Sequence, residues 1–181
     1  MRRQCAIPSM TLLILLGAPR MTVAEGPALF EPGLISTGFD ESHLTISPDG
    51  NTLYFLRNTP DFAHWTVLMS QRRGRRWSHP TLAPFSGTWS DADIFITRNG
   101  QRMFFVSNRP VNGVRHDDTD IWTAGREGDR WGEPHHVPEL SSVGYEWFPN
   151  MTDAGVIYFG SEREGGSGLS DFWRARWLGN H

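Results

Sequence analysis

The sequence predicts an all-β protein built from repeated units of short strands, because one phrase occurs three times along its 181 residues. Each occurrence is a turn followed by an alternating apolar stretch: SPDGNTLYF at 47–55, TRNGQRMFF at 97–105 and MTDAGVIYF at 151–159. The occurrences are spaced by 50 and 54 residues, which is typical of a repeat architecture. Aromatic and β-branched residues dominate these stretches, and no helical periodicity follows the N-terminal segment, so we expect strands throughout.

Each unit holds four expected strands. The first precedes the turn, at 43–47, 93–97 and 147–151, and the second is the apolar stretch of the repeated phrase. The third lies at 66–70, 120–124 and 171–175. The fourth surrounds a tryptophan three residues before a proline, at 77–80 and 131–134. Four strands in about 40–50 residues are typical of one blade of a β-propeller.

The turns between the first and second strands carry hairpin signals. Asp49-Gly50 and Asn99-Gly100 predict type I′ turns, in which both central residues have positive φ. The third unit has Asp153-Ala154-Gly155 at this place, so we expect its turn to be built differently.

Several motifs resemble a known family. SPDGNTLYF, SNRP followed downstream by DTDIW, and SEREGGSGLSDFW are similar to the WD40-like repeat of TolB-type β-propellers. The resemblance covers about residues 28–177 and implies four-stranded blades. It implies no single function, because such repeats occur in scaffolds, in periplasmic binding proteins and in propellers fused to enzymes.

The N-terminus predicts export. We expect a secretory signal peptide at 1–24, because Arg2 and Arg3 precede an apolar run that is shorter than the ~20 residues of a membrane-spanning helix. Residues 25–181 would then be the repeat domain, with units at about 38–86, 87–140 and 141–181 and with 28–37 as a stray outer strand.

The amino-acid composition limits the cellular compartments and the binding partners that we expect for this protein. The only cysteine, Cys5, lies in the expected signal peptide, which excludes disulfides and thiol catalysis in the exported part. All 17 basic side chains are arginine and the net charge is −3, so there is no basic field for nucleic acid. We expect a bacterial protein of the periplasm or the cell exterior, with no membrane span after its signal peptide.

Three units are fewer than the 4–8 blades with which propellers close. Two interpretations stay open. Two chains form a homodimer with a six-bladed ring, each donating its 28–37 strand to the last unit of the other, or the chain is a piece of a longer propeller.

The loops before the first strand and after the second strand of each unit share one face of a propeller, and we expect the ligand-binding site there. The candidate residues are four acids and three aromatic side chains: Glu41, Asp91, Asp93, Glu146, Trp89, Tyr145 and Trp147. The carboxylates can bind Ca²⁺ as a cofactor or a cationic ligand, and the rings can stack on a polyhydroxylated ligand. Asp91 and Glu146 can also act as a glycosidic acid–base pair if they lie ~5–9.5 Å apart. Alternatively, the acids only hold the loops and the units together.

Other polar residues have structural explanations. Arg109 and Arg163 occupy equivalent positions and are expected to bond to the acids of the loops. A metal site at His116–Asp120 is disfavoured because Asp120 has a counterpart in Asp171. His135 and His136 alternate along a strand, so we expect one ring to be solvated and the other packed.

Most of these residues recur in every unit, which favours a scaffold over an enzyme. The predicted function is therefore an exported, non-catalytic module that binds a protein partner or a small polar or glycan ligand and needs no cofactor. The alternative is a carbohydrate-active hydrolase or lyase that uses carboxylates on the loop face.

Overall fold

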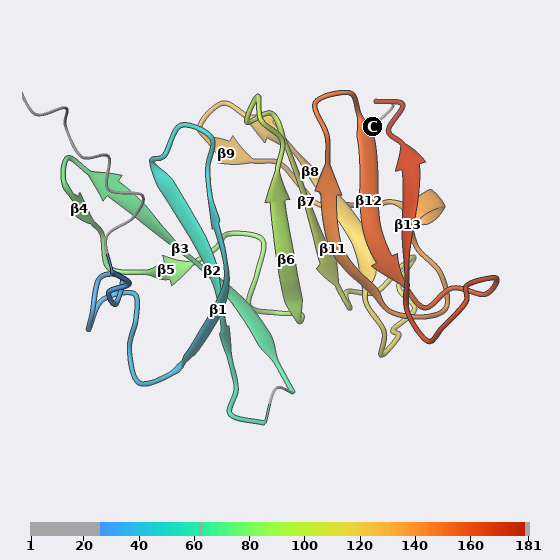
Figure 1. Cartoon of the computed structure of the whole chain (residues 1–181), viewed down its shortest axis with the longest axis horizontal. Coiled ribbons are helices and arrows are strands. Elements are labelled where there is room, and N and C mark those ends of the chain that lie inside the picture. Colours follow the sequence, from blue (N-terminus) through green and yellow to red (C-terminus); the bar gives the residue numbers. More distant parts are fainter. Residues whose placement is uncertain (1–25, 62, 180–181) are drawn as a thin grey trace, which may run out of the picture.

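The computed structural model describes residues 26–61 and 63–179 (Figure 1). The expected signal peptide, including Cys5, lies outside these residues, and so does Phe62. The all-β prediction is confirmed: the described chain folds into three antiparallel sheets, which stand side by side in Figure 1.

The strands follow the expected order. The first sheet contains β1 (Asp40–Ile46), β2 (Thr52–Asn58), β3 (Trp65–Arg73), β4 (Arg76–Trp77) and β5 (Thr81–Leu82). The second contains β6 (Asp91–Ile96), β7 (Arg102–Ser107), β8 (Asp120–Glu127), β9 (Arg130–Trp131) and β10 (His135–His136). The third contains β11 (Glu146–Met151), β12 (Val156–Ser161) and β13 (Asp171–Arg176), and a short 3₁₀ helix, η1 (Pro138–Leu140), precedes it.

The expected fourth strand is divided into two short pieces. β4 and β9 each end at a tryptophan and pair with the third strand of their sheet, and the ladder resumes only at β5 and β10. Pro80 and Pro134 lie in the gaps between these pieces. Proline has no N–H to donate to a ladder, which explains the break.

The hairpin turns differ from the prediction. Only Gly50 and Gly100 have positive φ (72° and 69°), whereas Asp49 and Asn99 do not, so the turns are not type I′. The glycine N–H instead bonds to the carbonyl oxygen three residues earlier, at 2.8 Å in the first turn and 2.7 Å in the second. Pro48 fixes a negative φ in the first turn, which excludes type I′ there.

The third turn keeps the glycine hydrogen bond of the other two but closes its hairpin differently, as expected. Gly155 has φ 75°, and its N–H bonds to the carbonyl of Thr152 at 2.9 Å. Thr152 N–H then bonds to the carbonyl of Val156, which closes this hairpin one residue earlier than the other two.

Phe104 and Phe105 show how the core is divided between the sheets. Both rings are fully buried, and neighbouring residues of a strand point to opposite faces. Phe105 packs against Phe85, in the segment that leaves the first sheet, at 5.2 Å between ring centroids. Phe104 meets Trp177, which follows the third sheet, edge-on at 5.0 Å. The apolar core therefore fills the two spaces between adjacent sheets.

The segment 28–37 does not add an outer strand to any sheet of this chain. Residues 30–36 form turns with one isolated bridge between Pro32 and Ser36. Ile35, only 3% exposed, packs against Leu53 and Phe55 of the first sheet. The segment therefore covers the face of the first sheet that points away from the second. Across residues 26–61 and 63–179 there is no helix with the length and hydropathy to span a membrane.

The turn geometry makes Gly100 more sensitive to substitution than Gly125. A Cβ at either position meets open space, but only Gly100 has a positive φ. We expect Gly100→Ala to lower the free energy of unfolding by about 1–2 kcal/mol, the cost of a left-handed conformation. Gly125→Ala should be neutral or stabilising by up to ~1 kcal/mol. Urea denaturation measures both, and equal effects would contradict the turn geometry.

Candidate functional site

A partly buried arginine holds the second sheet to the segment that precedes it. Arg109 donates from Nη2 to Asp91 Oδ1 at 2.6 Å and to the carbonyl oxygen of Phe85 at 3.0 Å. Its Nε donates to Ser107 Oγ at 3.0 Å. Phe85 belongs to the connection from the first sheet, whereas Asp91 and Ser107 pair on β6 and β7. One guanidinium therefore links two strands and the incoming connection.

The third sheet contains the same arrangement. Arg163 Nη2 donates to Glu146 Oε1 at 3.4 Å and to the carbonyl oxygen of Leu140 at 2.7 Å, and its Nε donates to Ser161 Oγ at 2.9 Å. The sequence predicts these bonds between equivalent arginines and loop acids. We call each set of an arginine, a carboxylate, a serine and a carbonyl an arginine clamp.

Aromatic rings support both clamps. The guanidinium carbon of Arg109 lies 4.9 Å from the ring centroid of Phe105, and that of Arg163 lies 4.8 Å from the ring centroid of Phe159. A tryptophan of the third strand lies 5.1 Å and 5.4 Å away, respectively. Cation–π contacts of this kind are worth more when they are shielded from water.

The first sheet has only part of a clamp. Arg57 bonds to Glu41 at 3.1 Å and lies directly opposite it in the ladder, at the position that a serine occupies in the other sheets. Thr37 also donates to Glu41 through its N–H and its hydroxyl. Burial raises the pKa of Glu41, but the bonds from Thr37 and Arg57 outweigh it and lower the pKa below its ordinary value. Glu41 is 13% exposed, so its pair with Arg57 is less shielded from water than the pairs of the fully buried Asp91 and Glu146.

The clamps decide what two predicted site acids can do. Asp91 and Glu146 are fully buried. Asp91 accepts a bond from Arg109, and Glu146 accepts bonds from Ser142, Ser161 and Arg163. Burial raises the pKa of both carboxyls, while Arg109 and Arg163 oppose that rise. A ligand arriving from solvent does not reach these oxygens. Their geometry supports the structural alternative rather than a glycosidic acid–base pair.

Asp93 lies among the inner strands at a strained position. It has φ 53°, and the equivalent residues His43 and Phe148 have φ 51° and 49°. All three mark register shifts in the ladders of β1, β6 and β11, which identifies them as β-bulges. Each bulge re-aims its residue toward the line along which the three inner strands meet.

The bulge residues bond to one another. Phe148 N–H donates to Asp93 Oδ2 at 2.9 Å, and His43 Nε2 lies 3.4 Å from Asp93 Oδ1. The rings of His43 and Phe148 stack, with centroids 5.7 Å apart, beside a hollow of about 360 Å³. Burial raises the pKa of Asp93, against the opposing Phe148 bond and His43. The carboxylate thus joins all three sheets at their inner edges.

Two of the three predicted aromatic residues, Tyr145 and Trp147, come together on the loop face. This face is defined as the connections before β1, β6 and β11 and after β2, β7 and β12. Tyr145 and Trp147 stack in parallel, with centroids 5.2 Å apart. Trp65, at the start of β3, adds a third ring 5.7 Å from Trp147. Trp65 was not among the predicted residues. The equivalent positions of the other sheets hold Thr119 and Ser170, so an aromatic residue at this position is a recognisable signal.

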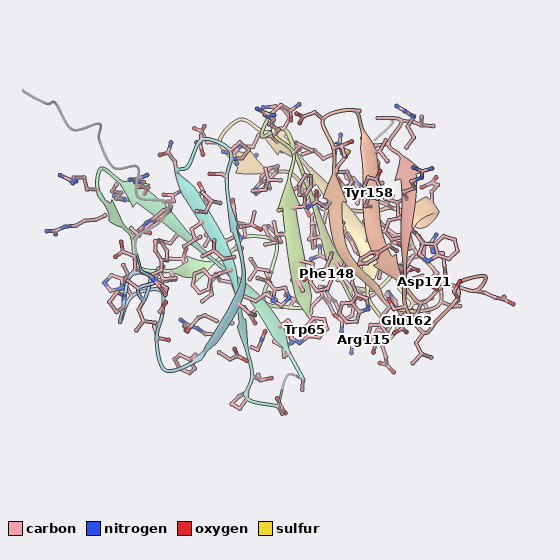
Figure 2. All side chains as sticks on the ribbon, in the orientation of Figure 1. Trp65, Arg115, Phe148, Tyr158, Glu162 and Asp171 are labelled. Carbon is pink, nitrogen blue, oxygen red and sulfur yellow. The ribbon has the colours of Figure 1, made fainter. Side chains whose placement is uncertain are left out.

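Trp89 lies on the same face beside a cation. The guanidinium carbon of Arg115 lies 5.2 Å from the centroid of the Trp89 ring. Figure 2 places Arg115, Trp65 and Glu162 along one edge of the molecule. Arg115 is exposed and Trp89 is partly exposed, so both are accessible to a ligand.

His116 is held by acceptors on both ring nitrogens. Nδ1 lies 2.7 Å from Asp118 Oδ1, and Nε2 lies 3.0 Å from the carbonyl oxygen of Arg109 and 3.4 Å from Asp120 Oδ2. His136 Nε2 approaches the same Asp120 oxygen to 3.2 Å. Within the described residues, no three His, Cys, Asp or Glu side chains are placed to hold a metal ion.

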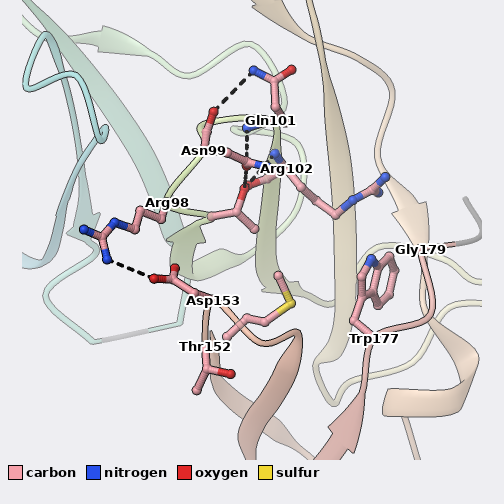
Figure 3. A pocket seen from close by; sticks show the side chains of 10 residues that line it. Arg98, Asn99, Gln101, Arg102, Thr152, Asp153, Trp177 and Gly179 are labelled. Atoms are coloured by element: carbon pink, nitrogen blue, oxygen red, sulfur yellow. Dashed lines mark hydrogen bonds and ion pairs between the residues drawn. The ribbon is translucent and has the colours of Figure 1, made fainter.

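A separate hollow of about 560 Å³ lies on the opposite side, beside the hairpin turns of the second and third sheets. Figure 3 shows Arg98 bonded to Asp153, at 2.9 Å. Arg102 lies over Trp177, 5.2 Å from the ring centroid. None of the predicted site residues lines this hollow.

Comparison with protein-family models and with curated proteins finds no match for this chain. The likeness to TolB-type WD40-like repeats therefore depends on the motifs. To these the structure adds that the chain forms three antiparallel sheets.

Removal of a clamp arginine should destabilise the fold. Arg109→Met leaves the fully buried Asp91 carboxylate without its counter-charge, and we expect a loss of about 3–5 kcal/mol in the free energy of unfolding. Arg98→Met breaks the exposed pair with Asp153 and should cost at most ~1 kcal/mol. Chemical denaturation compares the two variants. Similar losses would show that the clamp contributes no more than a surface ion pair.

His116 should make stability depend on pH. Burial lowers the pKa of His116, but Asp118 and Asp120 outweigh it and raise the pKa above its ordinary value. The folded state therefore binds the proton more tightly than the unfolded state. The resulting stability is present below about pH 6.5 and is lost as the pH rises through the raised pKa.

His116→Gln should remove this slope in urea midpoints measured between about pH 5.5 and pH 8.5. His79→Gln is the control, because that side chain is exposed. An unchanged slope in His116→Gln would contradict the assignment.

Proposed function

We propose that this protein is an exported, non-catalytic binding module of the β-propeller type with TolB-like units. Its loop face would bind a polyhydroxylated ligand, such as a glycan chain, or a protein surface that carries one. The single observation that carries this proposal is the contrast between the two sets of predicted site residues. The acids are engaged inside the fold, whereas the aromatic residues gather on one face.

The engaged acids argue for binding without catalysis. Asp91 and Glu146 are occupied by the arginine clamps, and Asp93 by Phe148 N–H. A general acid or base must reach the proton it transfers within hydrogen-bonding distance. A hard cation such as Ca²⁺ would have to open the fold around the fully buried Asp91 and Glu146 before it could reach their oxygens.

The loop face offers flat apolar rings together with hydrogen-bond donors. Trp89 and Tyr145 present partly exposed rings, and the exposed Arg115 lies beside Trp89. Tyr145 is further fixed by its hydroxyl, which donates to the carbonyl oxygen of Asp117 at 3.2 Å. Rings fixed in place lose little entropy on binding, and tryptophan, tyrosine and arginine are the residues enriched at binding hot spots.

The double variant Trp89→Ala/Tyr145→Ala should weaken binding to an array of neutral and acidic oligosaccharides by about 10–100-fold, as expected for the loss of two hot-spot side chains. The variant should fold, because neither ring is fully buried. Leu82→Ala is the control, since Leu82 is half exposed on an outer strand away from the loop face.

Equal binding by the double variant and the wild type would contradict the assignment of the loop face. Incubation of the same oligosaccharides with the protein should release no products. Product release that Asp91→Asn or Glu146→Gln abolishes in a folded protein would overturn the non-catalytic proposal.

A further inference from the structure

The outer face of the third sheet exposes apolar side chains at positions that are buried in the other sheets. Tyr158 is 42% exposed, whereas its equivalents Tyr54 and Phe104 are 3% and 0% exposed. In the first two sheets this face packs against the sheet that follows. β13 is the last strand of the described chain and borders this open face (Figure 1).

Phe172 on β13 shows the same contrast more strongly. It is 90% exposed, whereas its equivalents Val67 and Ile121 are fully buried. The carbonyl oxygens of those two residues also accept hydrogen bonds, from Ala83 N–H and Val137 N–H, both at 3.0 Å. Within the described residues, no strand pairs with the outer edge of β13. The third sheet therefore lacks both a covering face and an outer strand.

The segment 28–37 matches the missing strand in sequence. Ile35 follows Pro32 by three residues, just as Ala83 follows Pro80 and Val137 follows Pro134. Within this chain Ile35 covers Leu53 and Phe55, the face of the first sheet that points away from the second. Glu31, at the start of the segment, has φ 45°, a conformation that costs a non-glycine residue on the order of 1 kcal/mol.

We propose that two copies of this chain form a closed dimer by exchanging residues 28–37. In the dimer, Ile35 N–H of each chain donates to the carbonyl oxygen of Phe172 in the partner subunit, and the segment becomes the outer strand of the partner's third sheet. Its departure uncovers Leu53 and Phe55, which then receive the face that carries Tyr158 and Phe172. One movement thus covers the exposed face of the third sheet and supplies its outer strand. The dimer contains six sheets, which lies within the 4–8 blades that close a propeller ring.

Charge favours this head-to-tail arrangement over a face-to-face one. Arg174 and Arg176 are exposed on the open face of β13. Two such faces packed together would bring like charges into contact, which disfavours that pairing. His135 pairs with Thr123 in the second sheet, and the same register in the exchanged dimer pairs Gly33 with the partner's Arg174. Glu31, two residues before Gly33, then lies near the partner's arginines.

Oligomeric state tests the proposal directly. Light scattering on the purified chain should show twice the monomer mass at micromolar concentration. Phe172→Asp should raise the dissociation constant by about 100-fold or more, because the dimer buries the new charge. This variant leaves the monomer intact, since Phe172 is 90% exposed there. Val143→Asp, at an equally exposed valine, should remain dimeric.

Disulfide trapping tests the exchange itself. Gly33→Cys and Arg174→Cys proteins, mixed and oxidised, should form a covalent heterodimer. The segment 28–37 and β13, which contain these positions, lie at opposite ends of the row of sheets in a single chain (Figure 1). Cysteine at Gly33, where φ is 78°, is strained in the monomer, so the matched control is Gly33→Cys mixed with Val143→Cys. That control should give only background crosslinking.

The proposal would be overturned if the wild-type chain stayed monomeric even at concentrations about 100-fold above the micromolar range. A dimer that persists in Phe172→Asp would exclude this face. A dimer that gives no Gly33–Arg174 crosslink above the control would exclude strand exchange. These outcomes are independent of glycan binding. The binding proposal can therefore be refuted without refuting the dimer, and the dimer can be refuted without refuting the binding proposal.

Discussion

A partly buried arginine bonded to a carboxylate, a serine and a backbone carbonyl is the interaction on which this structure depends most. It occurs complete at Arg109 and Arg163, each time between the first two strands of a sheet and the connection that enters it. The carbonyl belongs to the preceding connection, so the clamp fixes the start of one sheet relative to the end of another. Packing alone does not fix this relation, because apolar contacts are not directional.

The same interaction limits what the protein can do. Asp91 and Glu146 have the residue type, position and burial that a catalytic acid would need, yet each is fully buried and bonded to its clamp arginine. Raised pKa values of buried carboxyls often mark active sites, but structural ion-pair networks produce them as well. The partners of the two carboxyls decide between these possibilities here. The aromatic side chains of the loop face carry the proposed binding function instead.

The two ends of the stack of sheets are unequal. At one end the segment 28–37 covers Leu53 and Phe55, and at the other Tyr158 and Phe172 face solvent. Apolar residues that are exposed in one sheet but buried at the equivalent positions of the other sheets indicate an interaction surface. The proposed exchange of one segment covers the exposed apolar residues at both ends. It needs only the packing that is already present between adjacent sheets.

The sequence by itself predicted the all-β class, the order of the main strands and the clamp arginines, because period-2 apolar patterns and repeated motifs are local and recur in phase. Only the tertiary structure decided where the site acids point, because a carboxylate becomes structural or functional through distant partners such as Phe85 and Leu140. It also placed Trp65 against Trp147 across 82 positions of sequence. The turn type was mispredicted for a related reason: a glycine signal predicts positive φ at one residue, whereas its neighbours decide which turn forms.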